Sequence, residues 1–551
     1  MTEGPAMSTT WDDLVTTALL GTDRRPASPG ALLDEAALRT VRRRAALLPA
    51  APPGPLPEAA PEDVRPPLPE AARRRLALLL AERAAGPGGS GRRGGGPDLT
   101  ELLPQWLAAA NGHGYRAPEA LLPGLLDAAR ARSDLRPGAL ALGGPRALWL
   151  ARLNPQWRYA LRDAPASSAA PAATETTGTA EAVDGAAHRD QVWQEGLFAE
   201  RVALLTSLRR HAPAAARELL ATTWAQERAE DRLMFLDTLR DGLSLADEPF
   251  LERALTDRGR TVRAVAAELL SALPASALAG RMAERARACV ALDRTGGRPT
   301  VIVEAPHECD AAMRRDGVVA KPPAGRGERS WWLGQLVEAA PLGIWCERLG
   351  VAGAAEAVAL PVADGWRPDL HAAWCRAAVR QGDAEWSRAL LGPAASPPAP
   401  SGASWLDPAK LLSALPPGER AGWVAEFIAA HGLSEAFRLL GVCAVPWAEP
   451  LGRAVVDALD TAREAGGYPW SFSGVMGMAE RCLDPDQADL LEELTVLPSG
   501  PEDASPHAVA PHGAAGYWAE AYQRLIGTLR LRAVMLEELE PVLRRPAGRW
   551  C

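Results

Sequence analysis

Leucine pairs recur at regular intervals along the stretch from residue 192 to residue 290. In each pair the two leucines are three positions apart, so they share one helix face and predict one buried stripe. Corresponding leucines of successive pairs are separated by 31 and then by 34 residues. A period in the thirties is typical of stacked antiparallel helix pairs, as in helical solenoids. The pairs are Leu205 with Leu208, Leu236 with Leu239, and Leu270 with Leu273.

Prolines punctuate this stretch where helical hairpins would turn. Pro213 follows the first predicted helix, Pro249 precedes another, and Pro274 follows the helix that contains Leu270. Proline fits the first turn of a helix but interrupts its interior, so these positions mark helix ends. Three units are the minimum for a repeat array, and an ordinary helical bundle with coincidental leucine spacing is the alternative.

The third unit carries a more specific pattern. Asp257 precedes its second predicted helix, and Val262 and Arg263 open that helix. These residues resemble a HEAT repeat, in which an Asp lies in the turn within the hairpin and a Val-Arg pair begins the second helix. The resemblance implies that Asp257 and Arg263 link the turns of adjacent hairpins. We therefore expect an all-α fold, a HEAT-like α-solenoid of antiparallel helix pairs with one small β-hairpin insertion.

Shifts in composition divide the chain into five expected parts. Residues 164–190 are rich in Ala, Ser, Thr and Pro, which predicts a disordered linker. Recurrent tryptophans after residue 365 indicate a second repeat array. The expected parts are 1–163, an N-terminal helical region; 164–190, the linker; 191–296, the HEAT-like repeats; 297–346, a β-hairpin and Trp-rich segment; and 347–551, a C-terminal helical repeat region.

The expected β-hairpin lies in the fourth of these parts. Residues 299–304 are mostly β-branched and bounded by Gly and Pro, which predicts a strand. Asp316-Gly317 offers a turn into a second strand at residues 318–319. A helix is expected to begin near residue 328.

The stretch from 301 to 346 also concentrates Trp, Arg and carboxylate side chains. Exposed Trp and Arg often form interface hot spots, so we expect an interaction surface here. His307, Cys309 and Asp310 are close in sequence but lack a second ligand pair, which argues against a metal site. The candidate surface residues are Arg314, Arg315, Asp316, Glu328, Arg329, Trp331 and Trp332.

Two other interpretations of this stretch stay open. In one, its Arg and carboxylate groups pair around the turn while Trp331 and Trp332 pack against the end of the repeats. In the other, the carboxylates of Asp310, Asp316 and Glu328 serve a hydrolase or nuclease-like accessory enzyme as acid and base. Substitution of Asp310 by Asn would abolish turnover in that case and leave partner binding intact.

Charge and composition narrow the function classes. The net charge of −8 and the pI near 5.7 disfavour nucleic-acid binding, including through the local cluster Arg42 to Arg44. Only Lys321 and Lys410 are lysines, so the abundance of Arg is typical of a GC-rich coding bias and does not by itself indicate phosphate binding. We therefore expect a protein partner rather than a nucleic acid.

The cysteines and apolar segments indicate a compartment. Seven widely spaced cysteines without a CxxC motif predict reduced thiols rather than a disulfide framework or zinc clamp. The first residues lack a targeting pattern, and no apolar run is long enough to predict a membrane span. These features predict a cytoplasmic protein without a membrane anchor.

The sequence contains none of the common enzyme motifs. It has no Walker A sequence, no GxSxG, no HExxH, no GxGxxG after a strand and no Cys/His metal spacing. We therefore predict no catalytic residue, no metal and no cofactor. Helical solenoids mostly present surfaces for partners.

Four sets of residues distributed along the chain carry a family resemblance. They are Thr10 to Leu14 with Ala18 to Arg24, Asn154 to Trp157, Arg232 to Leu239 with Asp247 to Leu251, and Cys309 to Leu333. Together they resemble an uncharacterised bacterial family, the domain of unknown function 5691, over nearly the whole chain. The family has no assigned catalytic residues, so the resemblance transfers none. It implies partners encoded beside its members: MoxR-like AAA+ ATPases, von Willebrand A-domain proteins and SWIM zinc-finger proteins.

The resulting hypothesis is a non-enzymatic helical-repeat scaffold. We expect it to join an AAA+ ATPase to a von Willebrand A-domain protein through the concave face of the repeats and the 301–346 stretch. The observations behind this expectation are the leucine periods, the concentration of Trp and Arg, and the missing catalytic motifs.

Overall fold

The structure, a computed structural model, describes seven stretches of the chain. They are residues 11–21, 28–44, 57–85, 99–163, 189–396, 407–495 and 512–541. Contacts between residues divide the chain into two units, Met1–Ala60 and Pro61–Cys551. Apart from residues 189 and 190, the predicted linker at 164–190 lies outside the described residues.

The first unit contains two helices in contact with each other. They are α1 (Trp11–Leu20) and α2 (Pro29–Arg44). Leu14 of α1 is buried, with 7% of its surface exposed. Gly21 follows α1 with φ of 79°, a left-handed conformation that commonly ends a helix.

The second unit is predominantly helical. It begins with α3 (Glu70–Ala85), α4 (Leu99–Gly112), α5 (Leu122–Ala131), α6 (Arg136–Leu153) and α7 (Tyr159–Asp163). It continues with α9 (Phe198–His211), α10 (Pro213–Thr223), α11 (Ala229–Thr238), α12 (Glu248–Ala254), α13 (Arg260–Ser271) and α14 (Ala277–Cys289). After a two-stranded sheet follow α15 (Ala311–Arg315), α16 (Glu328–Ala339), α17 (Gly343–Leu349), α18 (Ala354–Ala359), α19 (Arg367–Gln381) and α20 (Ala384–Leu391). The last are α21 (Pro408–Ser413), α22 (Pro417–His431), α23 (Leu433–Leu440), α24 (Glu449–Glu464), α25 (Ser473–Cys482), α26 (Ala488–Thr495) and α27 (His512–Glu537). Among the described helices, none is both long and apolar enough to cross a membrane.

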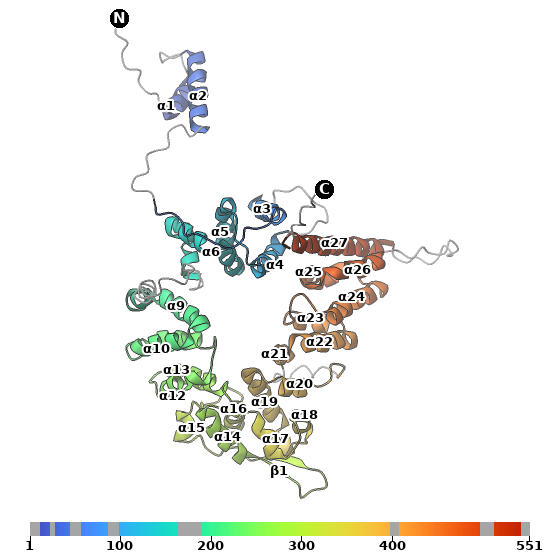
Figure 1. Cartoon of the computed structure of the whole chain (residues 1–551). Helices are drawn as coiled ribbons and strands as arrows, with labels where there is room; N and C mark the ends of the chain where they lie inside the picture. Colours follow the sequence, from blue (N-terminus) through green and yellow to red (C-terminus); the bar gives the residue numbers. More distant parts are fainter. Residues whose placement is uncertain are drawn as a thin grey trace, which may run out of the picture. The chain divides into compact units, whose positions relative to one another are not determined.

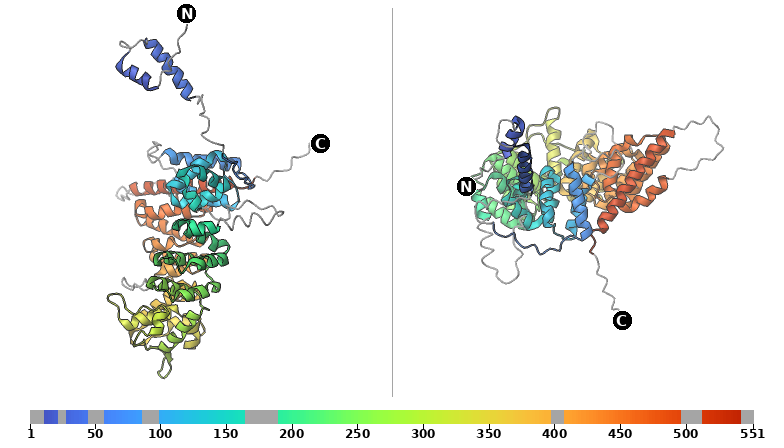
Figure 2. Two further views of the ribbon diagram at one scale, coloured as in Figure 1. Left: turned by 90° about the vertical axis from the view of Figure 1, so that its left-hand side faces the viewer. Right: turned by 90° about the horizontal axis from the view of Figure 1, so that it is seen from above.

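Helices α9 to α14 lie one above another (Figure 2): α9 contacts α10 and α11, and α13 contacts α11, α12 and α14. Their buried positions include four of the six predicted leucines. Leu205, Leu236, Leu239 and Leu270 have no exposed surface, whereas the other two leucines are half-buried. The predicted recurrence of a buried stripe is therefore confirmed for these four positions.

Prolines lie at helix boundaries as predicted. Pro213 and Pro249 occupy the first turns of α10 and α12, where the absent N–H would have no intrahelical acceptor. Pro274 follows the end of α13. The helix boundaries at these three positions therefore follow from the backbone chemistry of proline.

The β-hairpin differs from the prediction. The predicted strand at 299–304 is confirmed as β2 (Thr300–Val303), but it pairs antiparallel with the preceding β1 (Val290–Asp293). The predicted second strand at 318–319 is wrong, because Gly317 lies against α13, where a Cβ would come within 2.5 Å of the Cβ of Ala267. The chain enters β1 directly from α14 without a turn residue, so the sequence around Val290 resembled a continuing helix.

Arginine–carboxylate pairs join successive helices. Asp247, just before α12, accepts hydrogen bonds from Arg209 of α9 and Arg217 of α10. Asp257, before α13, pairs with Arg232 of α11 at 2.9 Å. The abundance of Arg thus has a structural use that codon bias alone does not explain.

The HEAT resemblance implied that Asp257 and Arg263 join adjacent helical hairpins. In the structure Asp257 does join them, but its partner is Arg232 and not Arg263. Arg263 donates to the backbone carbonyl oxygens of Asp257 and Arg258, at 2.7 and 3.2 Å. Because Arg263 lies in the first turn of α13, directly after this loop, its side chain reaches the local carbonyls. The carboxylate of Asp257 is instead taken by Arg232 of the preceding helix pair.

Apolar side chains of the second unit form three buried clusters. One lies among α3 to α7, one extends from residue 193 to residue 411, and one lies among α21 to α27. Tryptophans are buried in all three. The tryptophans with at most 2% of their surface exposed are Trp106, Trp193, Trp345, Trp374, Trp447 and Trp518.

The last helix of the second unit packs against its first helices (Figure 1). Arg75 of α3 pairs with both carboxylate oxygens of Glu538, at 2.9 and 2.7 Å. The Tyr115 hydroxyl donates to the carbonyl oxygen of Leu539 at 2.9 Å. Leu539 and Met535 are buried in the cluster of α3 to α7. Because further contacts lead from α4 through α9, α13, α16, α19 and α24 to α27, the helix contacts of this unit form a closed circuit.

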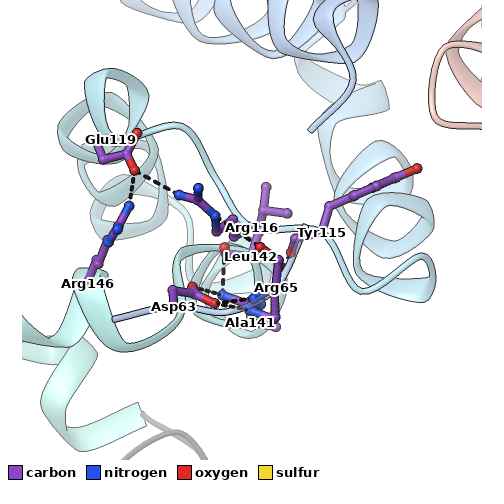
Figure 3. A network of polar contacts seen from close by, with 8 residues as sticks. All are labelled: Asp63, Arg65, Tyr115, Arg116, Glu119, Ala141, Leu142 and Arg146. Atoms are coloured by element: carbon purple, nitrogen blue, oxygen red, sulfur yellow. Dashed lines mark hydrogen bonds and ion pairs between the residues drawn. The ribbon is translucent and has the colours of Figure 1, made fainter. Parts of the chain in front are cut away.

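Figure 3 shows the network that fixes the segment before α3. The Arg65 guanidinium donates to both carboxylate oxygens of Asp63, at 2.9 and 2.7 Å. It also donates to the carbonyl oxygens of Tyr115, Ala141 and Leu142. Burial raises the pKa of Asp63, but the hydrogen bonds from Arg65 outweigh burial and leave the pKa below its ordinary value. These contacts hold the segment against α6.

Gly144 makes room for this guanidinium. It interrupts α6 with φ of 54° and ψ of −147°, a conformation accessible almost only to glycine. A Cβ at this position would lie 2.1 Å from Nη2 of Arg65. Nearby, Glu119 accepts from Arg116 at 2.8 Å and also pairs with Arg146.

Candidate binding cleft

The two tryptophans of the predicted surface stabilise the loop before α16. The indole N–H of Trp331 donates to the carbonyl oxygen of Val319 at 2.7 Å, and that of Trp332 donates to Ala320 at 2.8 Å. Trp332 is only 7% exposed, and Trp331 is half-buried against the same apolar cluster. Trp332 therefore cannot belong to an exposed surface, and its replacement would disturb packing.

Asp316 is also buried, which corrects its assignment to the surface. Only 2% of it is exposed, and its carboxylate pairs with Arg281 at 3.0 Å and Arg285 at 2.7 Å. Asp310 accepts from the backbone N–H of Met313 at 2.7 Å and so caps α15. Two carboxylates of the alternative acid–base set are thus engaged in structural contacts.

The remaining predicted residues are exposed on the loops and helices around α15 and α16. Arg314 donates to the carbonyl oxygen of Cys309, and Arg329 donates to that of Ala305. Arg315 and Glu328 are exposed as well. As an interaction surface, these four residues stay a prediction.

The structure also contains a cleft of about 1000 Å³, which the sequence did not predict. Its walls come from the end of α11, from α13, from α19 and α21, and from the loop before α16. Five of its lining side chains are cationic and two are carboxylates. The cations are Arg240, Arg326, Arg376, Arg380 and Lys410, and the carboxylates are Glu268 and Asp407. The lining side chains therefore sum to +3, and Asp237 and Glu338, which pair with three of these arginines from just outside the lining, leave a local charge of +1 in a chain whose net charge is −8.

Ion pairs position the two arginines of α19. Arg376 pairs with Glu338 of α16, and Arg380 pairs with the same carboxylate at 3.3 Å. Arg380 also donates to the hydroxyl of Ser271, at the end of α13, at 3.0 Å. These bonds connect the two sides of the cleft and fix the guanidinium groups that line it.

The outer cations, Arg240 and Lys410, are more exposed. Arg240 pairs with Glu268 at 2.9 Å and Asp237 at 2.7 Å, and these hydrogen bonds raise its pKa. Lys410 lies 3.8 Å from Asp407, and 71% of its side chain is exposed. Exposed pairs of this kind contribute little to stability, so their charges can exchange partners.

The thiol in the cleft is not activated as a nucleophile. Cys375 supplies the thiol among its lining residues. Burial raises the pKa of this thiol to about 12, and the opposing effect of Arg376 is smaller. At neutral pH the thiol stays protonated and is a poor nucleophile. Among the described residues, no group of three or more His, Cys, Asp and Glu could hold a metal ion.

The cleft had almost no signal in the sequence. Its cations extend from residue 240 to residue 410 and come from four separate segments, the turn after α11, the loop before α16, α19 and α21, so no motif or spacing connects them. The 301–346 stretch, singled out for its Trp and Arg content, contributes Arg326. Its guanidinium lies 6.0 Å from the ring centroid of Trp331.

Comparison with known proteins agrees with the family resemblance of the sequence blocks. No curated protein and no solved structure matches this chain. One family, described as a family of unknown function, has a sequence model that matches residues 13–539. This match extends over nearly the whole length of the chain, so the chain belongs to the family of unknown function DUF5691.

Proposed function

We propose that this protein is a non-enzymatic scaffold of the cytoplasm that binds a protein partner in the cleft between α13, α19 and α21. The observation that carries the proposal is the cleft itself, which is large, cationic and lined by side chains from several helix layers. A partner seated there would contact widely separated parts of the chain at once. The six described cysteines are free thiols, as suits a reducing compartment.

We further propose that the second unit is a HEAT-like α-solenoid. The order of helix contacts supports this architecture, since each pair contacts the next along the chain. The Asp–Arg links between successive pairs support it too, because they recur at Asp247 and Asp257. Solenoids use extended concave surfaces to bind partners.

The expected partners follow from the family resemblance of the sequence. They are a MoxR-like AAA+ ATPase, a von Willebrand A-domain protein and a SWIM zinc-finger protein. Joining the first two would make the chain an adaptor, with the cleft as one of its docking sites.

Direct binding to purified partners tests the proposal. The full chain is titrated in a calorimeter with the AAA+ ATPase and the von Willebrand A-domain protein encoded beside it, with and without ATP. The cleft variant Arg326→Glu with Lys410→Glu is compared with the control Arg74→Glu with Arg453→Glu. The control side chains are 75% and 61% exposed on α3 and α24.

We expect at least one partner to bind the wild type and the control alike and to bind the cleft variant more weakly. Equal binding by all three proteins would place the partner elsewhere and contradict the role of the cleft. Absence of binding to every partner would refute the adaptor function.

A further inference from the structure

We infer that the cleft recognises an acidic segment of its protein partner, one in which carboxylate side chains alternate with aliphatic ones. The inference rests on the proposed function and assigns the chemistry that the function leaves open. Three properties of the cleft lead to it: its local charge, its apolar floor and the kinds of side chain that its lining lacks.

The local charge selects an anionic ligand. The lining carries five cations and two carboxylates, and the side chains of three of the cations are more than a third exposed. The side chain of Lys410 is 71% exposed, that of Arg240 is 45% exposed, and that of Arg376 is 39% exposed. At physiological salt, charges more than about 8 Å away are largely screened. A short acidic segment therefore responds to the cleft and not to the −8 of the whole chain.

The apolar floor selects aliphatic side chains in the same ligand. Leu269 and Leu411 line the cleft and are each about 1% exposed, so they form its base. Leu243 and Val379 line it as well and are half-buried. A ligand with charges alone would leave the exposed parts of Leu243 and Val379 in contact with water. Aliphatic groups between the carboxylates would cover them.

The lining distinguishes a peptide from a nucleic acid. Among the described residues that line the cleft, none is aromatic, whereas single-stranded nucleic acids are held by base stacking on aromatic side chains. Glu268 and Asp407 interrupt the cationic surface, which opposes a continuous phosphate backbone. The same interruptions suit a peptide, whose charges are separated by uncharged residues.

The existing ion pairs show how a partner's carboxylates can enter. Lys410 lies 3.8 Å from Asp407, a long and exposed pair. Arg240 divides its donors between Glu268 and Asp237. An incoming carboxylate can take a donor from either cation without leaving a buried charge unpaired, so desolvation opposes this exchange only weakly.

The test uses a fluorescent synthetic peptide in which glutamates alternate with leucines. Its binding to the full chain is followed by anisotropy, beside a glutamine-for-glutamate peptide, a glutamate-only peptide and a single-stranded DNA of matched charge. The protein variants are Arg326→Glu with Lys410→Glu and the control Arg74→Glu with Arg453→Glu. If the first variant unfolds more readily than the wild type, the milder Arg326→Gln with Lys410→Gln replaces it.

We expect the alternating peptide to bind the wild type and the control equally. The cleft variant should bind it more weakly by on the order of tenfold, and added salt should weaken binding to the wild type. The glutamine peptide should bind least, and the glutamate-only peptide should lie between the two. This order separates the charge requirement from the apolar one.

Several results would overturn the inference. Tighter binding of the DNA than of the peptide, lost in the cleft variant, would assign the cleft to nucleic acid. Unchanged peptide binding in the cleft variant would place the peptide elsewhere. If a purified partner binds the cleft but the peptide neither binds nor competes, the acidic chemistry is wrong while the scaffold function stands. If neither partner nor peptide binds, both fail together.

Discussion

Replacing Asp247 by alanine should destabilise the second unit strongly, because it removes the centre of a buried ion-pair network. Asp247 has no exposed surface. Its two carboxylate oxygens accept from Arg209 at 2.9 and 3.0 Å, from Arg217 at 2.9 Å, and from the backbone N–H of Ser244 at 3.0 Å. Without the carboxylate, the Arg209 side chain, itself 0% exposed, would keep only backbone carbonyls as partners.

The expected loss follows from the charge left behind. Removing one partner of a buried ion pair typically costs about 3 to 5 kcal/mol. The matched control is Asp237→Ala, whose pair with Arg240 is 62% and 45% exposed, and such exposed pairs contribute about 0 to 1 kcal/mol. Urea unfolding followed by circular dichroism measures both, and the midpoint should fall much further for Asp247→Ala than for the control.

The same network predicts a dependence on pH. Burial raises the pKa of Asp247, but the hydrogen bonds from Arg209 and Arg217 outweigh it and hold the pKa below 3.8, its ordinary value. The carboxylate thus stabilises the fold fully above pH 3.8, and this contribution is lost as pH falls from there through the folded-state pKa. The difference in urea-unfolding midpoint between the wild type and Asp247→Ala should therefore become smaller below pH 3.8. An Asp247→Ala midpoint equal to that of the control would refute the reasoning.

Three further perturbations follow from single residues. Gly144→Ala should cost about 1 to 3 kcal/mol in urea unfolding, because its backbone conformation suits glycine and a Cβ would meet Arg65; a midpoint matching wild type would mean that α6 can rearrange. Burial lowers the pKa of His371 to about 4, so stability should fall by roughly 3 kcal/mol between pH 6.5 and pH 4 as the unfolded chain takes up a proton that the folded chain does not. His371→Asn should flatten that slope, and an unchanged slope would assign it to other groups. Cys375, with its pKa raised to about 12, should resist iodoacetamide at pH 8 in the folded protein and react after unfolding in urea, as mass spectrometry of the alkylated peptides would report.

Local signals in the sequence were sufficient for much of the helical structure. The leucine spacing identified buried positions such as Leu236 and Leu270, and prolines such as Pro213 and Pro249 marked helix starts. Both signals act within a few residues, through helix geometry and the missing N–H of proline. This is why they could be recognised without knowledge of the fold.

Features that depend on distant partners were missed or misplaced. Val290 belongs to a strand because it pairs with Val303 and because Arg348 donates to its carbonyl oxygen at 2.9 Å. The burial of Trp332 depends on the loop between α15 and α16, which contains Ala320. Neither contact leaves a trace in residue spacing, since strand formation depends on tertiary neighbours.

The candidate site is the extreme case of this dependence. Arg240 and Lys410 look like ordinary surface charges in the sequence, and only the folded structure shows that both line the same cleft. Glu338, which holds Arg376 and Arg380, has no motif that distinguishes it. The chemistry was visible in the composition, but its location required the three-dimensional arrangement.

The contact between α27 and the first helices of the second unit also has a consequence during protein synthesis. Arg75 leaves the ribosome long before Glu538, which follows it by 463 residues. At about 5 to 20 residues per second, the interval is roughly 20 to 90 seconds. Throughout that time the apolar positions later covered by Met535 and Leu539 have no partner on the growing chain. A growing chain therefore exposes these apolar positions until α27 has been made, and a chain released before α27 would keep them in contact with water.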